Sequence, residues 1–148
     1  MERRRDRHRS QRIVRAYPDV LDLGHRGEEI LTLVEDGELT LGYQSSSYLT
    51  DRVPELGFVD LPFLFRDNDH ARTAMDGTLG RYLTKKIEER INYRILGYFE
   101  NGFRHISNKL RPVRRPEDLA GMKTRVLPSD VQARTFQLLG ATPMRMDL

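Results

Sequence analysis

The chain has 148 residues, of which 38% are hydrophobic and 32% charged, a composition that suits one ordinary folded domain with a modest core. It contains no cysteine, which excludes disulfides, thiolate metal sites and cysteine nucleophiles. The formal net charge of +3 is unevenly distributed, because residues 1–15 hold seven arginines against two acidic residues and the rest of the chain is slightly acidic.

Residues 1–15, MERRRDRHRSQRIVR, form a strongly basic segment. Clustered arginines neutralise phosphates, so a small basic-tailed nucleic-acid-binding protein is one interpretation. The other is a solvated extension, which is favoured because the remaining basic residues form no stripe and no aromatic residues interleave with the arginines. We therefore expect residues 1–25 to be a basic, disordered tail. No apolar region follows the arginines as a signal peptide would require, and no run approaches the roughly 18 apolar residues of a membrane span.

The next part of the chain predicts a helix, a short strand and a turn-rich stretch. Apolar residues at helical spacing predict a helix over 26–38, with Gly37 at its C-terminal end. Residues 39–44, LTLGYQ, predict a short strand, and 45–57 predict a short helix or turn. The apolar run 58–65 contains a proline, which favours an edge strand or a packed loop.

Residues 67–91 predict a long helix that is weakened or kinked at Asp76–Gly77. Two further strands are predicted at 93–99, YRILGYF, and at 103–108, FRHISN. A polar, proline-bearing connection leads from there to residue 121.

The last part of the chain predicts a strand, a helix and the beginning of another strand. Residues 122–126, MKTRV, alternate between inward and outward side chains as a half-buried strand does. Ser129 is a candidate N-cap, and Gln132 completes a capping-box pattern in front of a helix over 131–140. Residues 141–148 then predict the start of a strand.

This alternation of helices and strands predicts an α/β layered architecture with mixed parallel strands. Neither end of the chain coincides with a natural domain edge, so we expect it to be a fragment of a longer protein.

Several kinds of site are excluded or disfavoured by the sequence. There is no G-x-G-x-x-G or P-loop motif, and the histidines share no ligand spacing, so neither a nucleotide cofactor nor a metal is expected. A hydrolase would have to use Ser45 or Ser46 with His25 or His105, but no G-x-S-x-G motif surrounds the serines.

Two arginines follow or end predicted strands and are candidate anion-binding residues. Arg104 follows the turn after the 93–99 strand, and Arg125 ends the strand that leads into the last helix. In open α/β sheets ligands bind beyond the carboxyl ends of strands, and the arginine fork suits a carboxylate. The alternative is that Arg125 points into solvent or pairs with a surface acid such as Asp118 or Asp130.

The order and spacing of five segments resemble the solute-binding proteins of tripartite ATP-independent periplasmic (TRAP) transporters, the DctP family. The segments are DGELT (36–40), PELGFVDLPFLF (54–65), NGFR (101–104), PEDLAGMKTRV (116–126) and GATP (140–143). The resemblance runs over residues 26–148.

The resemblance implies a two-lobed, periplasmic-binding-protein-like (Venus-flytrap) α/β fold, here truncated. Residues 26–102 would form part of the first lobe, and 103–148 the crossover and the start of the second. It also implies a periplasmic, non-enzymatic protein without a cofactor. Such a protein closes over a small organic acid and delivers it to a sodium-coupled membrane permease, with no nucleic-acid partner.

The resemblance further implies which residues contact the ligand. Arg125 would form the salt bridge to the ligand carboxylate, and Arg104 would be a second ligand-contacting arginine. The remaining contacts would come from polar side chains at or just past the ends of two predicted strands: Gln44, Ser45, Ser46 and Ser129.

Overall fold

The structure is a computed structural model that describes residues 15–17 and 19–146. Its α-helices and strands are α1 (Ile30–Glu35), α2 (Asn68–Asp76), α3 (Thr78–Arg90), β1 (Lys123–Val126), α4 (Asp130–Leu138) and β2 (Thr142–Arg145). Five short 3-10 helices are η1 (Val20–Leu23), η2 (Gly27–Glu29), η3 (Ser46–Leu49), η4 (Pro54–Asp60) and η5 (Pro116–Leu119). None of the helices in the described part of the chain is both long and apolar enough to cross a bilayer.

Residues 19–25, which precede the predicted boundary at residue 26, have defined structure. Asp19 accepts a hydrogen bond from the Leu21 backbone N–H at 3.0 Å and so caps η1, and Gly24 ends it with φ +80°. Val20 is buried, which ties this turn to the rest of the molecule. Residues 19–25 are therefore not part of a disordered tail, and residues 1–14 lie outside the described part.

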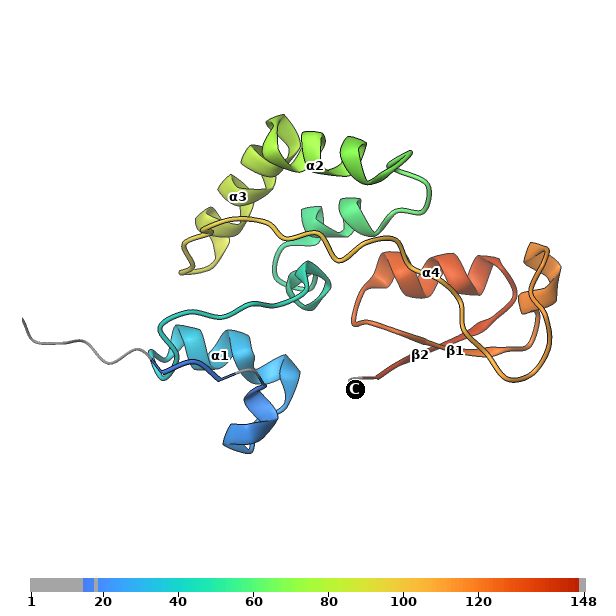
Figure 1. Cartoon of the computed structure of the whole chain (residues 1–148), viewed down its shortest axis with the longest axis horizontal. Helices are drawn as coiled ribbons and strands as arrows, with labels where there is room; N and C mark the ends of the chain where they lie inside the picture. The colour runs from blue at the N-terminus through green and yellow to red at the C-terminus, as the bar shows by residue number, and fades with distance from the viewer. Residues whose placement is uncertain (1–14, 18, 147–148) are drawn as a thin grey trace, which may run out of the picture.

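One hydrophobic core lies between α3 and the 3-10 helices η3 and η4. Its fully buried members come from residues 49–91: Leu49, Val53, Leu56, Leu83, Ile87 and Ile91. The predicted helix over 67–91 is confirmed, and it is broken at the predicted point, because Gly77 leaves helical geometry with ψ −142°. At the break the chain changes direction, so that α2 and α3 lie at an angle to each other and are in contact (Figure 1).

The turn between α2 and α3 depends on a glycine at the contact. Gly80 is buried, and a Cβ atom added there would lie 1.7 Å from the Met75 carbonyl oxygen. Only a residue without a side chain allows the backbones to approach this closely.

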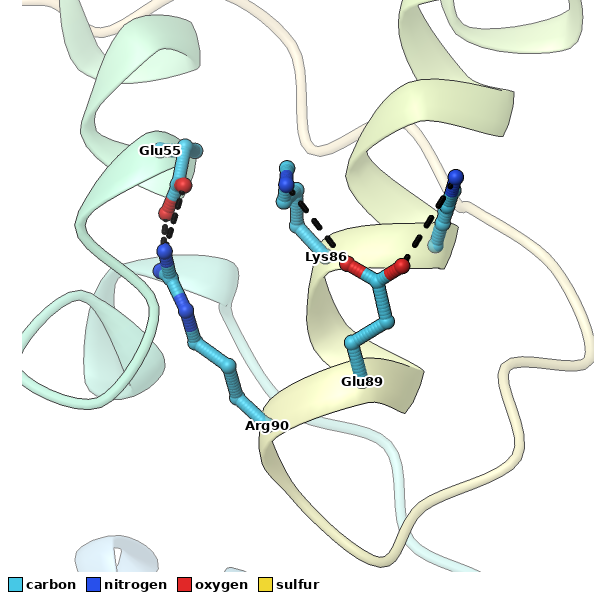
Figure 2. Close-up of polar contacts among 5 residues, drawn as sticks. Glu55, Lys86, Glu89 and Arg90 are labelled. Carbon is cyan, nitrogen blue, oxygen red and sulfur yellow. Dashed lines mark hydrogen bonds and ion pairs between the residues drawn. The ribbon is translucent and has the colours of Figure 1, made fainter.

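The C-terminal end of α3 is tied to η4 by an ion pair. Figure 2 shows the Arg90 guanidinium facing the Glu55 carboxylate, with Nη2 donating to Oε1 at 2.7 Å. On the neighbouring turn Lys86 lies 3.5 Å from Glu89. These groups are largely solvated, so the ion pairs orient the helix more than they stabilise the fold.

A second unit consists of β1, α4 and β2. The two strands pair in parallel, with Lys123 opposite Thr142 and Val126 opposite Arg145, and α4 packs against them (Figure 1). Leu119, Met122 and Ala141 form its separate buried core. The predicted strand, helix and following strand over 122–148 are therefore confirmed for the described residues.

Three predicted strands are wrong, because residues 39–44, 93–99 and 103–108 form no backbone ladder with any described residue. Residues 91–95 nevertheless alternate between inward and outward side chains, and the Tyr93 hydroxyl donates to the Leu31 carbonyl at 2.6 Å. The Tyr43 and Phe99 rings meet edge to face at 5.5 Å, so two of these segments touch through side chains alone. A strand needs a partner for its N–H and C=O groups, and the described chain supplies none here.

The run 58–65 is not an edge strand, because residues 58–60 end η4 and residues 61–65 form a turn-rich loop. The loop exposes Phe63 completely and gives it a positive φ of 60°. The predicted alternative of a packed loop therefore holds only in part.

We expect Gly80→Ala to lower the free energy of unfolding by about 2–3 kcal/mol, since the new methyl group must push two backbones apart. Chemical denaturation of the chain measures this change. Gly97→Ala is the matched control, because a Cβ at Gly97 meets no atom within 4 Å. Equal stability losses in the two variants would contradict the role given to Gly80.

Candidate functional site

The candidate site is built where β1 ends and α4 begins. After Val126 the chain needs only Leu127, Pro128 and Ser129 to pass from strand to helix. The carboxyl end of the strand and the N-terminus of the helix therefore lie together, which is the location where α/β proteins bind anions.

Arg125 is exposed on β1, and its Nε donates to the Met146 carbonyl oxygen at 2.9 Å. This bond holds the side chain across the end of β2. Its two terminal nitrogens make no hydrogen bond to other described residues, and no described carboxylate forms an ion pair with them. The two acids that could have neutralised it are engaged elsewhere, since Asp118 accepts from backbone N–H groups and Asp130 pairs with Arg145.

Ser129 is the predicted N-cap of α4, and this prediction is confirmed. Its hydroxyl accepts from the Gln132 backbone N–H at 3.4 Å, and its side chain is fully buried. The reciprocal half of the predicted capping box is wrong. The Gln132 amide does not return to Ser129 but donates to Ser47 Oγ at 3.2 Å and to Asp60 Oδ1 at 2.8 Å. Partners from another segment therefore compete successfully with the local cap.

Gln44 has its side chain occupied by nearby backbone. Its amide nitrogen donates to the Gly27 carbonyl, and its amide oxygen accepts from the Ser45 N–H at 3.0 Å. Ser45 and Ser46 are half-buried at the start of η3. The glutamine thus supports the turn that presents the two serines.

Arg104 lies within residues 101–110, all of which are exposed. No hydrogen bond or ion pair in the described part of the chain links it to Arg125 or to the serines of η3. The structure therefore does not bring the two predicted arginines into direct contact.

The arrangement offers no support for hydrolase chemistry. Within the described residues, neither Ser45 nor Ser46 is hydrogen-bonded to His25 or His105, and His25 lies instead 3.9 Å from Glu29. A serine nucleophile needs a base within hydrogen-bond reach. No group of three or more described His, Asp or Glu side chains is placed to hold a metal ion.

Three polar residues near the site were missed by sequence reasoning as functional candidates: Ser47, Thr50 and Asp60. Asp60 and Gln132 are separated by 72 positions, so no local pattern links them. The one signal in the sequence is Ser47 itself, which directly follows the predicted ligand contacts Ser45 and Ser46.

The turn that precedes β1 is held by charged side chains bonded to backbone. Arg111 donates to the carbonyls of Asp118 and Ala120 at 3.0 and 2.8 Å. The Asp118 carboxylate accepts from the backbone N–H groups of Arg114 and Arg115, and these bonds lower the pKa of Asp118 below its ordinary value. This turn fixes the entry of the chain into the strand that carries Arg125.

Comparison with known proteins gives one family for nearly the whole chain. Residues 15–148 match the family described as bacterial extracellular solute-binding protein, family 7 (DctP).

Individual relatives agree with this family match. A solute-binding protein of Verminephrobacter eiseniae is 38% identical over 78% of the chain and 35% of its own length. The 2,3-diketo-L-gulonate-binding periplasmic protein YiaO of Escherichia coli is 32% identical over 90% of the chain and 40% of its own length.

Among solved structures, a TRAP periplasmic solute-binding protein of Sulfurospirillum deleyianum with bound succinate superimposes with a TM-score of 0.79 at 34% identity. The superposition covers 82% of the chain and 39% of that structure. The chain thus spans about two fifths of the length of the proteins it matches.

We expect the turn before β1 to weaken in acid through Asp118. A carboxyl whose pKa is lower in the folded than in the unfolded chain stabilises the fold above the unfolded pKa, and this contribution is lost as the pH falls through the folded pKa. The amide shifts of Arg114 and Arg115, followed by NMR from about pH 7 to below the ordinary aspartate value of 3.8, should report the loss.

Asp118→Asn should shift these two amides already at neutral pH and remove most of their pH dependence. Glu117→Gln, a change at the exposed neighbouring acid, should leave the wild-type profile intact. A profile unchanged by Asp118→Asn would assign the transition to another group.

Proposed function

Because the chain belongs to family 7 of the bacterial extracellular solute-binding proteins, we propose that it forms part of the ligand cleft of a binding protein for a small organic acid. The predicted DctP family and the two-lobed α/β fold class are confirmed by the family match and by the likeness to the S. deleyianum structure. Because the chain spans about 40% of such proteins, the activity of the whole protein is part of the proposal.

The single observation that carries the proposal is the state of Arg125. Its guanidinium is exposed at the end of β1, is steadied by the Met146 carbonyl, and keeps both terminal nitrogens unpaired among the described residues. Two parallel N–H donors match the two oxygens of a carboxylate. The nearby N-terminus of α4 adds a field that favours a negative charge.

Arg104, Gln44, Ser45, Ser46 and Ser129 are proposed as the remaining ligand-contact region. The half-buried hydroxyls of Ser45 and Ser46 suit the selection of ligand hydroxyl or carbonyl oxygens. Ser129 acts from behind, since its buried hydroxyl caps the helix whose N-terminus faces the anion. Arg104 lies on an exposed segment, so its approach to the ligand would accompany closure of the cleft.

The ligand class follows from chemistry that the relatives share. Succinate and 2,3-diketo-L-gulonate, named for two of them, differ in length and hydroxylation but both carry a carboxylate. We propose a dicarboxylate or sugar acid as ligand, the periplasm as location, and a TRAP membrane permease as the partner that receives the ligand. The proposed role is binding, without catalysis.

The nucleic-acid interpretation gains nothing from these comparisons, which name only solute-binding proteins among the relatives described above. The arginine-rich residues 1–14 lie outside the described part of the chain.

We expect Arg125→Ala to weaken binding of an organic acid about 10–150-fold in the full-length protein, because a charge-assisted, bidentate contact contributes roughly 1.5–3 kcal/mol. Arg104→Lys should weaken it far less, since the charge is retained. Isothermal titration calorimetry with succinate and 2,3-diketo-L-gulonate measures both effects.

Arg134→Ala is the matched control, because it removes one exposed arginine from α4 away from the strand end. The anchor assignment fails if Arg125→Ala binds the acid that wild type binds with the same affinity. The proposed function itself fails if the wild-type protein binds no organic acid of this class.

A further inference from the structure

A compact polar network joins two segments that are distant in the sequence. The Ser47 hydroxyl lies 3.1 and 3.0 Å from the two carboxylate oxygens of Asp60 and donates to them. The Gln132 amide, at the start of α4, donates to Ser47 Oγ at 3.2 Å and to Asp60 Oδ1 at 2.8 Å. The three side chains therefore form a closed triangle of hydrogen bonds.

Two members of the network are buried, and the third, Asp60, is half-buried. Ser47 is 1% exposed and Gln132 is 6% exposed. Buried polar groups destabilise a fold unless they are bonded, and no buried side-chain nitrogen or oxygen of the described residues lacks a partner. Removing one corner of the triangle would therefore leave the other two bonded to each other, each with fewer hydrogen bonds than before.

Two further contacts join the same segments. The Thr50 hydroxyl lies 3.0 Å from the Pro128 carbonyl, in the loop between β1 and α4. Gly57 of η4 faces Val131, and a Cβ at Gly57 would lie 3.0 Å from its Cγ2 atom. The segment 46–60, which contains η3 and η4, thus packs directly against the start of α4.

The network adjoins two of the predicted ligand contacts, Ser46 and Ser129. Ser46 directly precedes Ser47 along η3, and Ser129 accepts the backbone N–H of Gln132. Arg125 is four residues before Ser129, near the end of β1, and the loop from Leu127 to Ser129 connects β1 to α4. A shift of α4 against η3 would change the spacing between the serines and the arginine.

We propose that Asp60 is a positioning residue for ligand binding, which holds Ser47 and Gln132 and thereby sets the spacing between the 45–46 serines and the Arg125 strand end. The inference rests on the proposed function. Asp60 itself need not touch the ligand, because its carboxylate is occupied by the two donors.

The roles of carboxylate and amide in this pair can be exchanged, which provides a sharp test. Asp60→Ala removes the acceptor for both donors, and Gln132→Glu sets two carboxylates against each other. The double variant Asp60→Asn with Gln132→Glu restores a carboxylate beside an amide, now in opposite positions, and Ser47 can donate to the new carboxylate.

Calorimetry measures the affinity of each variant for succinate or 2,3-diketo-L-gulonate, whichever of the two the wild type binds. The measurement is made at a temperature where circular dichroism shows every variant folded. We expect Asp60→Ala and Gln132→Glu each to weaken binding roughly tenfold, as the loss of one or two buried hydrogen bonds would, and the double variant to recover most of the loss. Asp51→Ala, at an exposed aspartate of the same segment, should bind as wild type does.

The outcomes separate this inference from the proposed function. Wild-type affinity in folded Asp60→Ala would overturn the positioning role while leaving the anion anchor in place. A double variant no better than Gln132→Glu would overturn the paired arrangement. Absence of binding by the wild type would overturn the proposed function and the positioning role with it, and Asp60→Ala would then affect only the unfolding midpoint.

Discussion

The contact between the 46–60 segment and the start of α4 holds the described chain together. Its two hydrophobic cores share no residue: one is drawn from residues 49–91 and the other from 119–141. Hydrogen bonds join them through the Gln132 amide, the Asp60 carboxylate and the Thr50 hydroxyl, and Gly57 lies against Val131. Directional bonds of this kind specify one relative arrangement, whereas an apolar interface tolerates sliding.

This junction explains why the candidate site has its form. Among the described residues, the Arg125 side chain is hydrogen-bonded only to the Met146 carbonyl, so its position depends on where β1 and β2 end. The positions of Ser45 and Ser46 depend on Gln44, which accepts from the Ser45 N–H, and on Ser47, which is bonded to Asp60. Neither group could define a ligand pocket alone, because each belongs to a different unit. In the proposed binding site, the polar contact between the units would hold these two local features in one relative arrangement.

The extended segments show a different constraint. Residues 91–95 alternate in burial as a strand does, and Leu96 and Phe99 beyond them are each 77% exposed. Their side-chain pattern is that of a sheet, yet among the described residues their backbone has no partner. Alternation is a property of the segment, while a ladder is a property of two segments, and the chain spans only about two fifths of its relatives.

The sequence by itself determined the features that are decided within a few residues. The break at Gly77, the N-cap at Ser129 and the β1–α4–β2 unit follow from backbone freedom, a hydroxyl beside free N–H groups and side-chain periodicity. It also determined the family, through the order of short motifs. Only the tertiary structure decided where the Gln132 amide goes and which predicted strands find a partner. These choices depend on groups up to 85 positions away, whose approach is set by packing and not by local pattern.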